Sequence, residues 1–173
     1  VDEAIFYDSA GDDRFLAWSD RAYMFGDGYA NDARGFDTAT AHAGNGGEDW
    51  ATFYDTPGED KYVGWDGRAR MFGDDYANEA HNFRFTVAYS SGGDDTATFF
   101  DGAGDDKFLG WDGRALMVGA GYSNDARGFR FAVANADGGG HDQALFWDSA
   151  GDAKILGWAD RGLLVGAGYS HDA

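Results

Sequence analysis

The chain alternates short apolar runs with polar, glycine-rich turns. Within a run, apolar side chains take every second position, as Phe83, Phe85, Val87 and Tyr89 do. A period of two is typical of a half-buried β-strand. No stretch shows the 3.6-residue apolar period of a helix, and the one candidate for a helical turn is residues 30–33 with its equivalents. The pattern therefore predicts an all-β protein.

The same pattern recurs every 46–47 residues, which identifies an internal repeat. The aspartate that closes the first run recurs at intervals of 47, 46 and 47 residues, as Asp8, Asp55, Asp101 and Asp148. Tryptophan, arginine and tyrosine columns keep the same spacing. We expect a single repeat domain over residues 1–173, made of copies at about 2–47, 48–93, 94–140 and 141–173, with the last copy truncated.

Each copy contains four strand-like runs, which in the first copy are residues 4–7, 15–18, 21–26 and 36–43. The fourth run recurs at 83–90 and 129–136 but has no equivalent in the last copy, so fifteen strands are expected. Phenylalanine alternates with alanine in the first run, which predicts core positions at Phe6, Phe53, Phe99 and Phe146.

Two architectures fit four copies of such a unit. In a four-bladed β-propeller each copy would be an antiparallel blade. The hairpin signals Asp66-Gly67 and Asp112-Gly113 favour it, although Ser19-Asp20 and Ala159-Asp160 replace them in the other copies. In a parallel β-solenoid the copies would stack along an axis. A solenoid tolerates a truncated copy, and near-identical copies suit stacking, so we expect the solenoid and keep the propeller as the alternative.

Charge and composition narrow the functional classes. Against 13 Lys and Arg the chain has 31 Asp and Glu, a net charge of −18, which would repel a nucleic-acid backbone. There is no cysteine, so a disulfide framework and a thiol nucleophile are excluded. No apolar run reaches the 18 or so residues that cross a membrane, so no membrane insertion is expected. Catalytic motifs are lacking and every acidic pair recurs, so we expect no enzyme.

Much of the negative charge lies in two glycine-rich turns per copy. Hard cations such as Ca²⁺ take several carboxylate and carbonyl oxygens on a tightly turned backbone, which glycine permits. The alternative is ordinary turn chemistry without a metal. The candidate Ca²⁺ ligands are Asp8, Asp12, Asp13, Asp49, Asp55, Asp60, Asp94, Asp95, Asp101, Asp105, Asp106, Asp142, Asp148 and Asp152.

These turns resemble a known family. Residues 102–109, Gly-Ala-Gly-Asp-Asp-Lys-Phe-Leu, resemble the glycine-rich nonapeptide of the RTX family, and residues 92–96 are similar to it. The whole unit also resembles long Asp/Gly-rich repeats of very large secreted or surface proteins of aquatic bacteria. The RTX resemblance implies a parallel β-roll whose turns bind Ca²⁺. The chain departs from RTX in that longer segments separate the turns, and Ala153 replaces the second aspartate in the last copy.

The tryptophan column and the arginine column each have two interpretations. The tryptophans could stack on sugars, or pack within the solenoid. The arginines could bind a sulfate or a uronic acid, or pair with the turn residues Asp20, Asp66, Asp112 and Asp160. These columns are Trp18, Trp65, Trp111 and Trp158, and Arg21, Arg68, Arg114 and Arg161. Asn31, Asn78 and Asn124 are expected to form an amide ladder that His171 interrupts.

Together these features predict a structural repeat module of an extracellular or cell-surface protein: a fibre, a stalk or an adhesin spacer, rigidified by Ca²⁺. The expected partners are other copies, by self-association or by continuation into further repeats, because open solenoid ends are unpaired sheet edges. The alternative is a glycan-binding module that recognises cell-surface glycans through its tryptophan and arginine columns.

Overall fold

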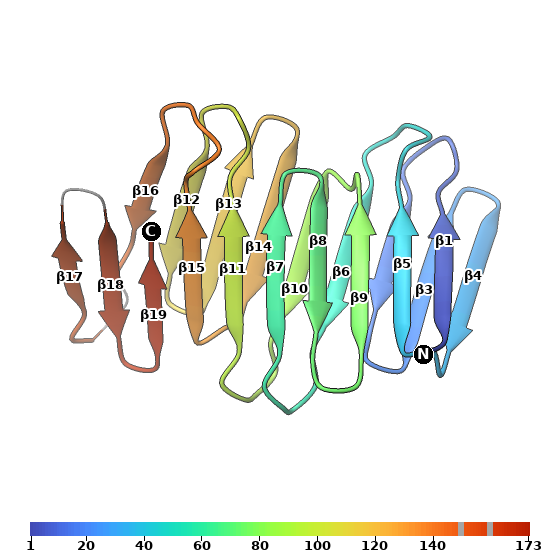
Figure 1. Cartoon of the computed structure of the whole chain (residues 1–173), viewed down its shortest axis with the longest axis horizontal. Helices are drawn as coiled ribbons and strands as arrows, with labels where there is room; N and C mark the ends of the chain where they lie inside the picture. Colours follow the sequence, from blue (N-terminus) through green and yellow to red (C-terminus); the bar gives the residue numbers. More distant parts are fainter. Residues whose placement is uncertain (149–150, 159–160) are drawn as a thin grey trace.

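The computed structural model describes residues 1–148, 151–158 and 161–173. This part contains nineteen strands and no helix. The strands form two sheets, of ten and nine strands, that lie face to face over most of the length of the molecule; β17 and β18 at the end of the ten-stranded sheet extend beyond the other sheet (Figure 1). Strands of successive copies pair with one another in both sheets. The chain is therefore a β-solenoid, as expected, and not a ring of separate blades.

Each of the first three repeat units supplies five strands rather than the expected four, and the described part of the truncated fourth unit supplies four. The first strands are β1 (Glu3–Tyr7), β6 (Trp50–Tyr54), β11 (Thr96–Phe100) and β16 (Gln143–Phe146). The second strands are β2 (Arg14–Ala17), β7 (Lys61–Trp65), β12 (Lys107–Trp111) and β17 (Lys154–Gly157). The third strands are β3 (Arg21–Gly26), β8 (Arg68–Phe72), β13 (Arg114–Gly119) and β18 (Gly162–Gly166).

The fourth strand, and in the first three units a fifth strand, complete the repeat unit. The fourth strands are β4 (Tyr29–Arg34), β9 (Ala77–His81), β14 (Tyr122–Arg127) and β19 (Tyr169–Asp172). The fifth strands are β5 (Thr38–His42), β10 (Phe85–Tyr89) and β15 (Phe131–Asn135).

The fourth strand corrects the prediction of a helical turn at residues 30–33. These residues belong to β4, which pairs antiparallel with β3 from Gly26↔Tyr29 to Arg21↔Arg34. Alanine, asparagine and aspartate are poor strand formers, so the local sequence gives little sign of this strand. The pairing follows from the tight turn that Gly28 makes at a φ of 80°.

The five strands explain why successive units alternate between the sheets. In the first unit β1 lies in one sheet, β2, β3 and β4 form an antiparallel meander in the other, and β5 returns to the first. The next unit therefore begins in the opposite sheet, with β6. Neighbouring coils pair in parallel, as β1 with β5 and β2 with β6. The solenoid thus combines parallel contacts between coils with an antiparallel meander in every unit.

The core between the sheets alternates large rings with small side chains. Phe15 and Phe53 are fully buried, with ring centroids 6.2 Å apart, and fully buried alanines such as Ala51 flank them. Small residues beside large ones let the two sheets approach closely. The predicted core positions Phe6, Phe53 and Phe99 are buried, whereas Phe146 is only partly buried, near the C-terminal end of the solenoid.

Because units alternate between sheets, equivalent side chains do not stack on one another. Asn78 in β9 and Asn124 in β14 lie in opposite sheets, so the predicted amide ladder is wrong. Instead, the Asn78 side chain donates to the carbonyl oxygen of Trp18 at 2.9 Å, and Asn124 does the same to Trp65. In the fourth unit His171 Nε2 lies 2.5 Å from the carbonyl oxygen of Trp111. Each bond links one unit to the unit before it.

Candidate metal sites

The two acidic turns of each unit stack on one another at the edge of the solenoid. Residues 8–13 join β1 to β2, and residues 43–49 join β5 to β6; the parallel pairing of these strands places the turns side by side. Gly47 has a φ of 106°, and a Cβ there would collide with the carbonyl oxygen of Gly11. Only glycine fits such a contact. The pairs Gly93 with Gly58 and Gly140 with Gly104 repeat it.

Stacking brings carboxylates from two neighbouring coils together. In each of three clusters, one oxygen from each of three aspartates lies within 4.8 Å of the others. One aspartate follows the first strand of a unit, the second precedes its second strand, and the third precedes the first strand of the next unit. We call these clusters the acidic triads; they are Asp8, Asp13 and Asp49; Asp55, Asp60 and Asp95; and Asp101, Asp106 and Asp142.

The triads alternate between the two edges of the solenoid. The first and third follow strands of the ten-stranded sheet, at the edge drawn uppermost in Figure 1, and the second follows β6 of the other sheet, at the opposite edge. Aspartates at equivalent positions are therefore not neighbours. The negative charges that do meet come from different positions of the repeat.

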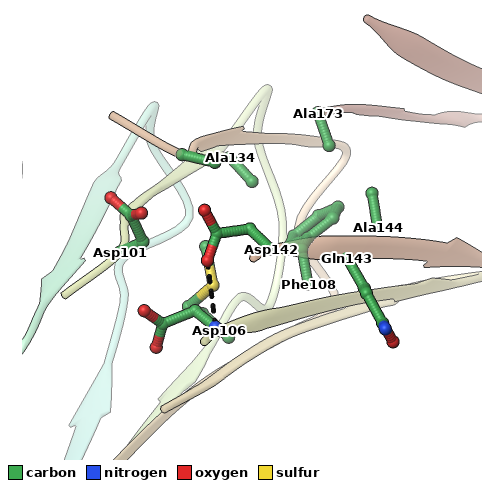
Figure 2. Close-up of a pocket in the computed structure, with 10 residues that line it drawn as sticks. Asp101, Asp106, Phe108, Ala134, Asp142, Gln143, Ala144 and Ala173 are labelled. Carbon is green, nitrogen blue, oxygen red and sulfur yellow. Dashed lines mark hydrogen bonds between the residues drawn. The ribbon is translucent and has the colours of Figure 1, made fainter. Parts of the chain in front are cut away.

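Backbone amide groups fix the geometry of each triad. The N–H of Asp13 donates to Asp49 Oδ1 at 2.8 Å, and the equivalent bond joins Asp60 to Asp95 at 2.7 Å. Figure 2 shows the third, from the N–H of Asp106 to Asp142, at 3.0 Å. Asp8 accepts bonds from the N–H groups of the next turn, for example from Gly44 at 2.8 Å. These bonds hold the carboxylates in place without neutralising them.

A tyrosine of the repeat column, which is not among the predicted metal ligands, supports every triad. Tyr29 donates its hydroxyl to Asp13 at 2.7 Å, Tyr76 to Asp60 at 2.8 Å and Tyr122 to Asp106 at 2.7 Å. Burial raises the pKa of these hydroxyls, so they remain neutral donors. The signal in the sequence is a tyrosine 16 residues after the aspartate and three after a glycine, against which its ring packs.

The triads carry negative charge that no described cation balances. Burial raises the pKa of Asp49, Asp95 and Asp101. Asp101 Oδ2 is buried and has no hydrogen-bond donor among the described residues. Between described residues, no ion pair involves a triad carboxylate. Three clustered carboxylates with only oxygen ligands suit a hard cation, so the triads can hold a metal ion.

The structure places the other predicted ligands outside the triads. Asp12 accepts a bond from the N–H of Glu48 and Asp105 one from the N–H of His141, both at 2.8 Å. Asp94 forms an ion pair with Arg130. Asp148 and Asp152 belong to no triad formed by the described residues. Residues 149–150 of their turn lie outside the described part.

The arginine column has internal partners, but not the predicted ones. Arg21 Nε lies 2.8 Å from Asp32, Arg68 Nε 2.5 Å from Glu79, and Arg114 Nε 2.9 Å from Asp125, each on the paired fourth strand. Arg161 Nε likewise lies 2.7 Å from Asp172. The turn residues Asp20, Asp66 and Asp112 do not form these pairs, and Asp160 lies outside the described residues.

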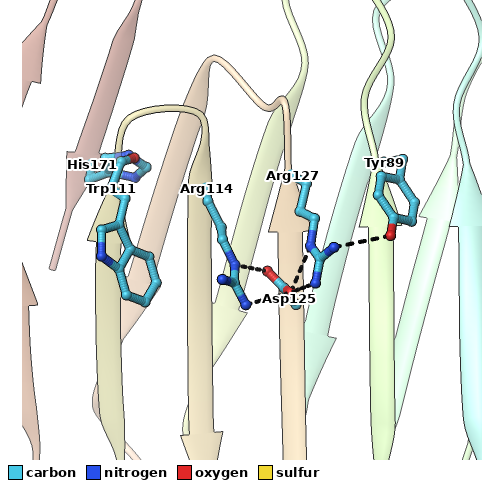
Figure 3. Close-up of polar contacts among 6 residues, drawn as sticks. All are labelled: Tyr89, Trp111, Arg114, Asp125, Arg127 and His171. Atoms are coloured by element: carbon cyan, nitrogen blue, oxygen red, sulfur yellow. Dashed lines mark hydrogen bonds and ion pairs between the residues drawn. The ribbon is translucent and has the colours of Figure 1, made fainter. Parts of the chain in front are cut away.

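These ion pairs lie on the outer faces of the sheets. Figure 3 shows Arg114 and Arg127 on either side of Asp125, with Arg127 also donating to the Tyr89 hydroxyl at 3.1 Å. The equivalent guanidinium groups of Arg34 and Arg21 lower the pKa of Asp32 to about 2. The arginine column therefore forms ion pairs with carboxylates of the chain itself.

Three of the four tryptophans in the repeat column stack on an aromatic ring of the next unit. Trp18 stacks on Tyr54 and Trp111 on Trp147, both with centroids 4.9 Å apart. Trp65 stacks on Phe100 at 5.9 Å. An arginine of the same unit lies over each ring, as Arg68 does over Trp65 at 5.1 Å. These contacts favour the packing interpretation of the column over sugar stacking.

Comparison with protein-family models, with curated proteins and with solved structures finds no match to this chain, so its function has to be inferred from its own geometry. Among the described residues there is no helix with the length and apolar character needed to span a membrane.

Proposed function

We propose that the chain is a structural repeat module of an extracellular or cell-surface protein, such as a fibre, stalk or adhesin spacer, and that Ca²⁺ bound in the acidic triads makes it rigid. The observation that carries the proposal is that each triad joins two coils. Asp13 and Asp49, for example, are 36 residues apart in the chain and directly hydrogen-bonded. A cation between them would tie neighbouring coils together.

The mechanism would be mechanical and additive. Each unit buries its apolar side chains against its neighbours, so length grows with the number of units. Without a cation, three carboxylates within 4.8 Å of one another repel each other and weaken the junction between coils. A bound cation turns this repulsion into an attraction. Because the triads alternate between edges, both edges of the solenoid would be braced.

Several features support Ca²⁺ rather than a softer metal. The triads offer only carboxylate oxygens, with backbone carbonyls in the adjoining turns, and Ca²⁺ prefers such ligands. The resemblance of residues 102–109 to the RTX turn points to the same ion. Extracellular calcium modules have dissociation constants of about 10⁻⁴–10⁻³ M, which suits a module that becomes rigid only outside the cell.

Glycan binding stays a second prediction with less support. The rings that would stack on sugars already contact an aromatic ring and an arginine in three units. Trp158 is 53% exposed, with Arg161 over its ring. Binding of cell-surface glycans by Trp158 would show as weaker retention of a Trp158→Ala variant on a glycan array.

Thermal unfolding in EDTA and in millimolar CaCl₂ tests the proposed role of the ion. We expect Ca²⁺ to raise the melting temperature, whereas the same concentration of NaCl raises it far less. An identical melting temperature in EDTA and in Ca²⁺ would contradict the proposal.

A further inference from the structure

The outer face of the nine-stranded sheet differs in charge from the rest of the molecule. Its side chains alternate with the buried ones and point away from the core. Among the described residues of this face, six cations stand against two aspartates. The cations are Arg14, Arg21, Arg34, Lys107, Arg114 and Arg127, and the aspartates are Asp32 and Asp125. A chain with a net charge of −18 thus presents one positively charged face, which suits an anionic partner.

A hollow lies in the middle of this face, over β10 and β14, with a volume of about 230 Å³. The register of the two strands explains it. Phe85 lies opposite Ser123, and Val87 lies opposite Asp125, so short side chains on β14 stand beside larger ones on the neighbouring strands. The volume is below the roughly 300–1,000 Å³ of a site for a drug-sized ligand. The hollow therefore has room for one ring of a ligand.

Two guanidinium groups line one side of the hollow, and Figure 3 shows how they are held. Arg114 and Arg127 together donate four hydrogen bonds to the buried carboxylate of Asp125. The three groups keep one net positive charge. Between described residues, no hydrogen bond uses Nη1 of Arg114, and the side chains of both arginines are 41% exposed. Arginines that an internal carboxylate already orients can donate their remaining N–H groups to a second carboxylate.

Apolar side chains line the rest of the hollow. The ring of Phe85 stacks on the ring of Trp50, with centroids 4.4 Å apart, and Val87 and Leu116 also contribute to the lining. Ser123 adds a hydroxyl group among these apolar groups. Trp50 is not a member of the tryptophan column, so the packing of that column leaves this site open. A matching ligand combines an apolar ring face, hydroxyl groups and a carboxylate, which is the chemistry of a uronic acid.

We infer that this hollow binds one uronate residue of an acidic polysaccharide, with its carboxylate on Arg114 and Arg127 and its sugar ring against Phe85. The other cations of the face would attract neighbouring carboxylates of the same polymer, because a positively charged surface steers a polyanion toward it. The site is separate from the acidic triads and needs no bound metal. The inference rests on the proposed function only in that an extracellular module meets such polymers.

Calorimetric titration with trigalacturonate in EDTA tests the site directly, and we expect saturable binding of one oligomer per chain. The methyl ester of the same oligomer keeps the rings but loses the charge. A tri-aspartate peptide with blocked ends keeps three carboxylates but has no sugar ring. Each control ligand should bind at least tenfold more weakly than trigalacturonate. No saturable binding of trigalacturonate, or equal binding of either control ligand, would overturn the inference.

Two pairs of variants separate the hollow from the general charge of the face. Ser123→Phe should fill the hollow without changing any charge and weaken binding at least tenfold. Thr98→Phe, on the outer face of the other sheet, should leave binding within twofold. Arg127→Gln should weaken binding at least fivefold, whereas Arg34→Gln, which removes the equivalent cation beside Asp32, should leave it within twofold. Equal losses within either pair would contradict the site. Matched melting curves would establish that each variant is folded.

Measurements in EDTA and in Ca²⁺ distinguish this inference from the proposed role of the ion. Binding of trigalacturonate in EDTA that Ser123→Phe abolishes would support the uronate site even if Ca²⁺ leaves the melting temperature unchanged. Conversely, stabilisation by Ca²⁺ of a protein that does not bind trigalacturonate would leave the role of the ion intact and overturn the uronate site.

Discussion

The backbone N–H of Asp60 donates to the carboxylate of Asp95 at 2.7 Å, across 35 residues of chain. This bond joins the two acidic turns of the second unit and brings both aspartates into one triad with Asp55. A carboxylate held this way by an amide group is well placed to bind a cation, but it is costly to keep charged and buried without one. The junction between coils should therefore respond to neutralisation, to pH and to the fit of its turns.

Neutralising Asp95 should stabilise the metal-free protein and abolish the response of its triad to Ca²⁺. Burial raises the pKa of Asp95, so its charged form is unfavourable at neutral pH, and Asp95→Asn keeps the oxygen that accepts from Asp60. We expect the melting temperature in EDTA to rise by about 2–4 °C, and the gain on adding Ca²⁺ to shrink. Asp94→Asn is the control, because Asp94 lies outside the triad and pairs with Arg130.

The sign of the pH dependence should reverse on adding Ca²⁺. In EDTA the raised pKa values of Asp49, Asp95 and Asp101 mean that these groups favour folding when protonated. Their contribution is complete below the unfolded carboxyl pKa of about 4 and is lost as pH rises through their folded values. In millimolar Ca²⁺, protons compete with the ion, so acidification should instead destabilise the protein.

Two histidines contribute a pH dependence of stability with the opposite sign, so the experiment needs a control for them. Burial lowers the pKa of His81 and His171, so their contribution to stability is complete above about pH 6.5 and is lost as pH falls through their folded values. Denaturant unfolding of the wild type and of the Asp49→Asn, Asp95→Asn, Asp101→Asn triple variant isolates the carboxyl contribution by difference. A difference that is independent of pH would count against the account.

Removing one tyrosine hydroxyl should weaken a triad without disturbing the core. Tyr76→Phe deletes the bond from the hydroxyl to Asp60, and a hydrogen bond to a charged group contributes about 1.5–3 kcal/mol. We expect a loss of about that size in the free energy of unfolding, measured with urea. Tyr7→Phe should change it little, because Tyr7 is 67% exposed.

Two adjacent glycines should respond very differently to alanine. Gly93 has a φ of 94°, and a Cβ there would collide with the backbone of Gly58 in the stacked turn. A Cβ added to Gly92 would meet no atom within 4 Å. Gly93→Ala should cost about 3 kcal/mol or more in unfolding free energy, whereas Gly92→Ala should stay within about 0.5 kcal/mol. Similar costs would mean that the turns are not stacked as described.

Much of the fold could be read from the sequence, because alternating apolar positions and a repeat leave few architectures open. The alternation of units between the two sheets could not be predicted from the sequence, because it depends on the number of strands per unit. The prediction of four strands per unit is wrong at residues 29–34, where Ala30, Asn31 and Asp32 form a strand that their propensities disfavour. Only the pairing with β3 reveals it.

The acidic triads, too, could be predicted from the sequence only in part. Spacing and composition predicted both acidic turns, but not that Asp13 and Asp49 would share one cluster 36 residues apart. That meeting depends on the length of a coil, which is a tertiary property. The supporting role of Tyr29 depends likewise on the hairpin that folds it back over Gly26.

Calorimetric titration of Ca²⁺ into protein that a chelator has freed of metal tests the central claim most directly. We expect one Ca²⁺ ion in each of the three acidic triads that the described residues form. Asp13→Asn, Asp60→Asn and Asp106→Asn should each remove one ion, whereas Asp105→Asn, next to a triad but outside it, should remove none. Absence of saturable heat, or a stoichiometry that the triad variants leave unchanged, would contradict the account.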